Sequence, residues 1–200
     1  MRSKGTLAII VIVLLVGFGG CAGCSTFNSM VTQEENVERT WADVETQYQR
    51  RADLIPNLVN TVKGAANFEQ ETLTAVTEAR ARATSINLSA DDLGDPAKMQ
   101  QFMEAQQQLG GALGRLLVVS ENYPQLRATE AFRDLQAQLE GTENRITVAR
   151  RDYNAAVTTY NTAVRRFPAS IIAGLTGFER RTPFEATPGS EKAPTVDFGS

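Results

Sequence analysis

The last third of the chain places apolar or small residues at alternating intervals of three and four, without a gap from residue 132 to residue 167. The positions are Phe132, Leu135, Leu139, Thr142, Ile146, Ala149, Tyr153, Ala156, Tyr160, Ala163 and Phe167. This spacing puts every member on one face of an α-helix, whereas a half-buried strand alternates at every second residue. The pattern stops at Pro168, which cannot continue a helix. It therefore predicts one long helix and favours helix packing for the whole fold.

A second stripe of the same kind runs through the first third of the chain. Its members are Val37, Trp41, Val44, Tyr48, Ile55, Leu58, Val62 and Ala65. Arg51 occupies the one slot that lacks an apolar residue. Pro56 predicts a kink or local bend about one turn earlier, and Gly64 offers a helix stop.

Two shorter helices are predicted between these stripes. Asn67 and Gln70 resemble a capping box that opens a helix through Ile86. Residues 87–94 read as a loop. Asp95 and Pro96 then form an N-cap and first-position pair for a third helix, which reaches Leu116 and breaks at residues 120–124.

No strand pattern appears before Thr182, so the expected fold is all-α. Short connections favour an antiparallel up-down-up-down four-helix bundle with two long and two shorter helices. We expect an N-terminal segment over residues 1–26, the helical bundle over residues 27–182 and a mobile tail over residues 183–200, where Pro, Gly, Ser and Thr dominate. A short apolar turn, residues 171–178, precedes that tail.

The N-terminal segment reads as a membrane anchor or a lipoprotein-type signal. Arg2 and Lys4 precede an unbroken apolar run, Leu7–Val16. One interpretation makes Cys21 or Cys24 the lipidated residue of a bacterial lipoprotein; the other retains the segment as an uncleaved single-pass anchor. Both place the helical body outside the cytoplasm, because the two basic residues hold the start of the chain inside.

Composition excludes several classes of function. The sequence holds 20 Lys and Arg against 23 Asp and Glu, so its net charge of −3 offers no electrostatic grip on nucleic acid. It contains no histidine, the commonest general base and metal ligand. Its two cysteines both lie in the N-terminal segment, which excludes thiol catalysis, zinc clusters and disulfides in the body. We expect no enzymatic activity, no cofactor and no bound metal.

Helix lengths predict a two-helix stalk near the membrane, because the two shorter helices cannot cover that end. Apolar side chains there would be only half covered, which makes them a candidate interaction surface for self-association or for another envelope protein. The residues of that surface are Val37, Trp41, Tyr153, Tyr160, Asn161 and Phe167, and Met30 and Val31 share the stalk. Four basic residues at the same end are candidate contacts for anionic headgroups: Arg165, Arg166, Arg180 and Arg181.

Polar residues also fall close to the predicted seams. Antiparallel pairing of the long helices brings Arg51 near Glu143, and we expect an interhelical polar layer made of Arg51, Asp53, Glu143 and Arg150. A ligand or anion site built from Arg50, Arg51 and Arg150 is the alternative.

Two further patterns are unusual for helices. A Tyr-Asn pair recurs seven residues apart, at Tyr153-Asn154 and Tyr160-Asn161, and predicts asparagines that hydrogen-bond across a helix seam. Gly110, Gly111 and Gly114 lie inside the third predicted helix, where close approach of a neighbouring helix would explain them.

Several stretches of this sequence match a known family pattern. They are Trp41–Val44, Arg50–Val59, Val62–Gly64, Glu121–Pro124, Thr142–Ile146, Arg150–Asn154, Tyr160–Asn161, Phe167–Pro168 and Pro194–Phe198. In these stretches the chain resembles the LemA family of bacterial membrane-anchored helical proteins. The resemblance implies an N-terminal membrane segment followed by an antiparallel helical bundle. It implies no enzymatic activity, because that family has no agreed biochemical function.

These observations lead to two hypotheses about function. The first is a membrane-anchored, non-enzymatic scaffold of the bacterial envelope whose stalk binds a second copy or another envelope protein. The alternative is an anionic-lipid-binding or membrane-shaping protein that acts through the basic end, residues 165–181.

Overall fold

The computed structural model describes residues 2–64 and 68–185, and the side chains of residues 23–64 and 68–185. The helices are α1 (Arg2–Lys63), α2 (Gln70–Ser85), α3 (Pro96–Ser120), α4 (Pro124–Arg127), α5 (Glu130–Arg165) and α6 (Ala169–Thr176), with a short 3-10 turn, η1 (Ala90–Gly94). The described residues contain no strand, and the prediction of an all-helical fold is confirmed.

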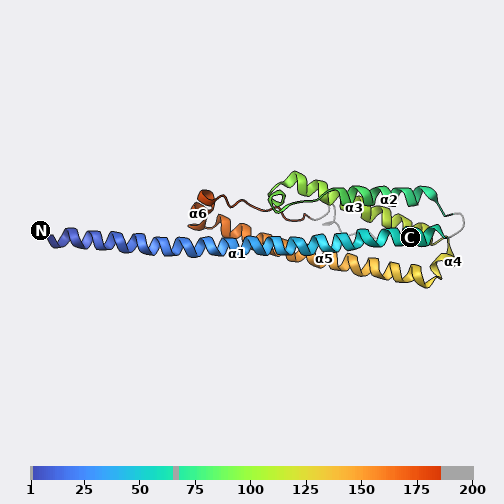
Figure 1. The fold of residues 1–200 in the computed structure, drawn as a ribbon, viewed down its shortest axis with the longest axis horizontal. Coiled ribbons are helices and arrows are strands. Elements are labelled where there is room, and N and C mark those ends of the chain that lie inside the picture. Colours follow the sequence, from blue (N-terminus) through green and yellow to red (C-terminus); the bar gives the residue numbers. More distant parts are fainter. Residues whose placement is uncertain (1, 65–67, 186–200) are drawn as a thin grey trace, which may run out of the picture.

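The molecule is elongated, and α1 runs along almost its whole length (Figure 1). Helix α5 packs lengthwise against α1, and α2 packs against α3. The α2–α3 pair lies beside the half of α1 that ends at Lys63, whereas α6 lies farther back along α1 toward the N-terminus (Figure 1). We call these two ends the far half and the near half.

Local sequence explains where the helices begin and end. The Asp95 side chain accepts a hydrogen bond from the backbone N–H of Ala97 at 2.8 Å, which caps α3 as predicted. Helix α5 ends at Arg165, before Pro168. Helix α1 stays helical through Pro56, and it ends one residue before Gly64. The predicted cap at Asn67 lies outside the described residues.

The far half has a helical core. Ile55 and Leu58 of α1 are fully buried there against side chains from α2, α3 and α5. This arrangement is what the apolar stripes of the sequence predict, because each helix turns its stripe toward the same interior.

The near half also has a closed core, and here the predicted two-helix stalk is wrong. Helices α2 and α3 do not run its length, but Leu88 and Leu93 of the 86–95 connection cover one side. Ala173 of α6 and Phe184 cover another. Met30 is 1% exposed and Val37 is 0% exposed as a result.

Part of the predicted mobile tail, residues 183–185, is described, and Phe184 packs in the near core. Residues 178–185, which we call the return segment, run from α6 along α5 toward the far half, and Phe184 is 6% exposed (Figure 1). The remainder of the predicted tail, residues 186–200, lies outside the described residues.

Residues 2–26 of the predicted anchor, which spans residues 1–26, belong to α1. The side chains of residues 2–22, including Cys21, lie outside the description. Cys24 is exposed and forms no disulfide. In the part of the chain that the structure describes, no helix combines the length and apolar character needed to cross a membrane.

Candidate interaction surfaces

The aromatic side chains predicted to form an interaction surface lie inside the near half. Trp41 is 4% exposed, and Tyr153 and Tyr160 are 0% exposed. The Trp41 ring has its centroid 5.3 Å from that of Phe102, 5.4 Å from that of Tyr153 and 5.9 Å from that of Phe184. The predicted docking surface is therefore wrong at Val37, Trp41, Tyr153 and Tyr160, because the return segment and α3 fill the space that a partner would need.

The two asparagines of the Tyr-Asn repeat bind the return segment. The Asn161 amide donates to the Arg181 carbonyl at 2.8 Å and accepts from the Arg181 N–H at 2.9 Å. Asn154 makes the same pair of bonds to Phe184, at 2.9 and 2.8 Å. The prediction that they bond across a helix seam is wrong, since their partner is an extended backbone.

The tyrosines of the same repeat are hydrogen-bonded and buried. The Tyr153 hydroxyl donates to the Thr182 carbonyl at 3.0 Å, and the Tyr160 hydroxyl lies 3.2 Å from the Glu34 carboxylate. Burial raises the pKa of both hydroxyls, with Arg181 opposing the rise at Tyr153. Both tyrosines therefore stay neutral and hold the return segment or α1 in place.

Arg51 is the centre of a polar layer between the halves. Its side chain is 4% exposed, and its Nη1 lies 2.7 Å from Glu143 Oε1. Its Nη2 donates to the side-chain and backbone oxygens of Gln106, at 2.7 and 3.1 Å. The guanidinium also lies over the Tyr48 ring, 5.0 Å from its centroid. Three helices, α1, α3 and α5, meet at this one cation.

Two residues predicted for that layer bond to other partners. Asp53 is exposed and accepts a hydrogen bond from Gln49 of its own helix at 2.8 Å. Arg150 lies over the Phe184 ring, 4.6 Å from its centroid, and donates to the Glu185 carbonyl. Arg50 is exposed on another side of α1, in a groove with α2, so the three arginines of the alternative anion site do not come together.

The basic residues of the near half divide into two groups. Arg181 is paired, because its Nη2 lies 2.8 Å from Glu34 Oε1 and its side chain is only 10% exposed. This pairing makes Arg181 unsuited to headgroup contact. Arg165, Arg166 and Arg180 are exposed.

Exposed apolar residues gather at the same end. Phe167 is 78% exposed, Ile171 is 56% exposed and Leu175 is 82% exposed. We call these three residues the α6 patch. Helix α6 lies against the start of the described side chains of α1: a Cβ atom at Gly23 would lie 3.9 Å from Ile172 Cδ1, and the Phe27 and Phe178 rings lie 5.5 Å apart.

A groove of about 600 Å³ lies between α3 and α5, and we call it the α3–α5 groove. Its lining includes Arg51, Gly111, Thr147 and Arg150, with Glu185 of the return segment at its edge. A Cβ atom at Gly111 or Gly114 would meet no heavy atom of the described residues within 4 Å. The expected close approach of a neighbouring helix at these glycines is therefore wrong.

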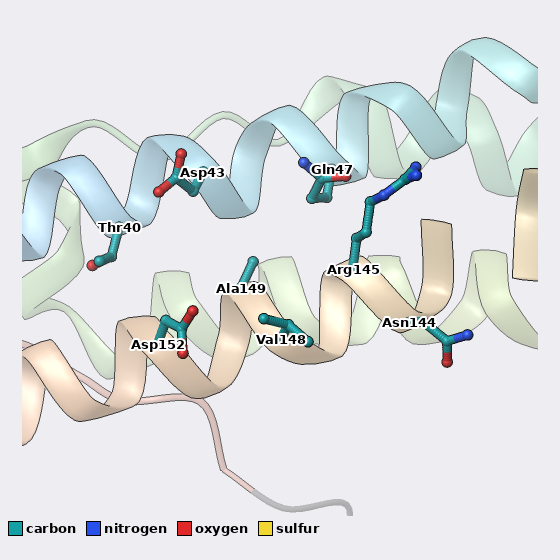
Figure 2. Close-up of a pocket in the computed structure, with 8 residues that line it drawn as sticks. All are labelled: Thr40, Asp43, Gln47, Asn144, Arg145, Val148, Ala149 and Asp152. Carbon is teal, nitrogen blue, oxygen red and sulfur yellow. The ribbon is translucent and has the colours of Figure 1, made fainter. Parts of the chain in front are cut away.

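A second groove, of about 390 Å³, lies on the outer side between α1 and α5 (Figure 2). Figure 2 shows Asp43 and Gln47 along α1, with Arg145 reaching from α5 toward α1 and the half-exposed Val148 lying on α5 between Arg145 and Asp152. Among the described residues, no three His, Cys, Asp or Glu side chains come together as a metal site would require.

The return segment is the element that no helical pattern in the sequence predicts. The Tyr-Asn repeat is the one sequence pattern that points to this segment, because two amides seven residues apart on a helix can bind an extended chain that runs alongside. Phe184 gave no periodic signal, since it is the single large apolar side chain between Phe178 and Val196.

Comparison with known proteins identifies relatives over most of the chain. The chain is 28% identical over 181 residues to magnetosome protein MamQ 2 of Paramagnetospirillum magneticum. The match covers 82% of this chain and 66% of that protein. It is 22% identical over 165 residues to protein LemA of Metamycoplasma hominis, with 71% of that protein covered. The chain thus spans just under two thirds of the length of the MamQ relative.

The model of the LemA family matches residues 40–198. The matched residues include Arg51 of the polar layer, Asn154 and Asn161, and the return segment. The chain belongs to the LemA family.

Proposed function

We propose that this chain is a non-enzymatic, membrane-associated helical scaffold of the bacterial envelope, and that its near end rests on the bilayer surface through the α6 patch. The observation that carries the proposal is the exposure of Phe167, Ile171 and Leu175 together at one end of the molecule. Soluble surfaces rarely gather large apolar side chains in this way unless something covers them.

Charge around the patch favours a lipid surface as that cover. Arg165, Arg166 and Arg180 are exposed near the patch, and Glu179 is the acidic neighbour in sequence. Each cation close to an anionic bilayer contributes about 1 kcal/mol of attraction. An apolar face with flanking arginines is the arrangement that interfacial helices use at membranes.

The course of α1 adds a second argument. Helix α6 packs beside Gly23, and the apolar run Leu7–Val16 belongs to the stretch of α1 that precedes this contact. We propose that this stretch anchors the chain, as a retained helix or through a lipid on Cys24 or Cys21. Either tether would hold the α6 patch at the membrane surface, with the helical body outside the cytoplasm.

The scaffold role is supported by what the side chains are used for. Arg51, Tyr153, Asn154 and Tyr160 all have partners within the chain, and those partners fix the packing of helices and of the return segment. The sequence lacks histidine altogether, so the common general base is absent.

Quenching by brominated lipids tests the membrane contact. The full-length protein is reconstituted into vesicles of phosphatidylcholine with or without phosphatidylglycerol, carrying Leu175→Trp or, as the matched control, Val148→Trp. Val148 is also exposed but lies 17 residues before the end of α5, about 25 Å along the helix. Native Trp41 is buried and provides the same background in both variants.

We expect brominated lipid to quench the tryptophan at position 175 and not the one at position 148. Quenching should rise with phosphatidylglycerol and fall when Arg165 and Arg166 are both replaced by Gln. Equal quenching at the two positions would remove the bilayer as the partner of the α6 patch. An envelope protein or a second copy would then be the partner to seek by crosslinking at position 175.

The intact mass of the purified full-length protein tests the anchor. A mass that includes Met1 identifies a retained helix, whereas loss of the preceding residues with added acyl mass identifies a lipidated cysteine.

A further inference from the structure

The return segment is held to α5 in a regular register. Asn161 hydrogen-bonds to the backbone of Arg181, and Asn154 hydrogen-bonds to the backbone of Phe184, with the same two bonds in each case. Seven residues of α5 therefore correspond to three residues of the return segment.

This register follows from the dimensions of the two elements. Seven residues of an α-helix rise about 10.5 Å, and three residues of an extended chain span about 10 Å. Because these two lengths match, an extended chain that lies along α5 meets the same helix face at every third residue of its own. The next position of that face after 161 and 154 is Thr147, and the corresponding position in a continued return segment is residue 187.

No described residue fills the space at that next position. Glu185 ends the described part of the return segment at the edge of the α3–α5 groove, and Arg150 donates to its carbonyl at 3.4 Å. Thr147 lines the groove on the α5 side and is exposed. Gly111 lines it on the α3 side, and its missing Cβ leaves room that no other described atom fills within 4 Å.

We propose that the α3–α5 groove is a binding site for an extended peptide, and that its occupant is this chain's own C-terminal segment, residues 186–198, in the register that places residue 187 beside Thr147. Two observations select this occupant. The chain leaves the described part at the groove edge and points along α5 toward the far half (Figure 1). The LemA family model continues to residue 198, so the segment is part of the pattern shared with the family. This proposal goes beyond the membrane role and does not depend on it.

The chemistry of the segment fits the site. Ala186, Thr187 and Gly189 are small, which suits a groove with a glycine wall. The buried Nε of Arg51 has no hydrogen-bond partner among the described residues, although the rest of its guanidinium does. An incoming backbone carbonyl would supply the acceptor that this N–H lacks.

Engineered disulfides test the register in the full-length chain. Cys21 and Cys24 are first replaced by Ser, and then Thr187→Cys is combined with Thr147→Cys or, as the matched control, with Val148→Cys. The two α5 positions are adjacent and exposed, but Val148 lines the other groove, between α1 and α5. The protein is equilibrated in detergent with a glutathione redox buffer, and the effective concentration of each thiol pair is measured from the fraction of intramolecular disulfide.

We expect the effective concentration to be about ten times higher for the 147–187 pair than for the 148–187 pair, because docking holds one thiol near the other. Equal values for the two pairs would overturn the proposal. Disulfides that join two molecules would overturn it as well, since the groove would then hold the segment of another copy. Circular dichroism of each variant checks that its helix content is unchanged.

A third variant tests whether the open groove itself is needed for docking. Gly111→Leu places a large side chain on the α3 wall of the groove, where a Cβ atom meets no described heavy atom within 4 Å, and leucine is a better helix former than glycine. In this background we expect the effective concentration of the 147–187 pair to fall to that of the control pair. An unchanged value would place the segment outside the groove.

Discussion

Arg51 shows how one residue can decide the register of three helices. Its guanidinium is almost fully buried at the point where the far core meets the near core, and it bonds to Glu143 of α5 and Gln106 of α3. A buried cation of this kind contributes little net stability, because desolvation offsets its attractions. Its main effect is to make other helix registers unfavourable, since they would leave the charge without partners.

Replacing Glu143 with Gln should therefore lower stability only modestly. We expect a loss of about 1 kcal/mol, below the 3–5 kcal/mol typical of a broken buried pair, because water screens a half-exposed carboxylate. The Glu143 side chain is 49% exposed. Urea unfolding measures the loss, and Asp53→Asn serves as the control because Asp53 is exposed and lies outside the layer. Equal losses in the two variants would contradict a special role for the Arg51 pair.

Gly111 and Gly177 differ in backbone conformation but offer similar space for a side chain. In the described part of the chain, no heavy atom lies within 4 Å of a Cβ atom placed at Gly111 or at Gly177. Of these two glycines only Gly177 has a positive φ, of 81°. Gly111→Ala should raise stability by about 0.5–1 kcal/mol because alanine favours the helix. Gly177→Ala should lower it by about 1–2 kcal/mol because a side chain is strained in the left-handed region. Melting temperatures that shift in the same direction would show that φ does not govern the difference.

At the scale of elements, the return segment completes the cover of the near core together with α3 and α6. Residues 178–185 contain no helical period, yet Phe184 stacks on Trp41 and meets the Tyr153 ring edge-on, with centroids 5.4 Å apart. The segment can lie there because Asn154, Asn161 and Tyr153 satisfy its backbone groups. An extended chain can enter an apolar core only when its N–H and C=O groups find such partners.

Phe184→Ala should consequently open the near core. We expect a loss of about 3–5 kcal/mol, as for other buried phenylalanines cut to alanine. The fluorescence of Trp41 should shift to longer wavelength as its cover is lost. Phe167→Ala is the control: that side chain is 78% exposed, and its removal should change stability by less than about 0.5 kcal/mol. Emission from Trp41 that stays unchanged in Phe184→Ala would show that the return segment does not cover it.

At the scale of the whole molecule, burial of tyrosine hydroxyls ties stability to alkaline pH. Burial raises the pKa of Tyr48, Tyr153 and Tyr160 above the value of about 10 that they have in an unfolded chain. Because the pKa of each of these hydroxyls is higher in the folded state, the tyrosines of the unfolded state ionise first as the pH rises. The stabilising contribution is complete below pH ~10 and is lost as the pH rises above it.

We therefore expect the melting temperature to fall steadily above pH ~10, with tyrosinate absorbance appearing together with the loss of helix. Circular dichroism and ultraviolet absorbance on the same samples measure both. Tyr160→Phe should make the fall shallower, since one of the three groups is gone. Tyrosinate absorbance from all three that rises while the helices stay intact would contradict this account.

The helices could be predicted in detail from the sequence, whereas the surfaces could not. The alternating intervals from Phe132 to Phe167 and the stop at Pro168 predict α5, which spans Glu130–Arg165. Asp95 and Pro96 predict the start of α3. Trp41 and Tyr160, however, were placed on an open surface because helix lengths alone leave the near end uncovered. The Tyr-Asn repeat predicts asparagines that bond across a helix seam, and it does not reveal that their partner is the return segment.

The sequence by itself determined the helical elements and their apolar faces, because helix periodicity and end signals act between residues within a few positions of one another. It also determined that Arg51 would face Glu143, since antiparallel pairing of two long stripes allows few registers. Only the tertiary structure decided what covers those faces at the near end. The burial of Trp41 depends on Phe184, which lies 143 positions away in the chain, and no local pattern in residues 178–185 encodes that contact.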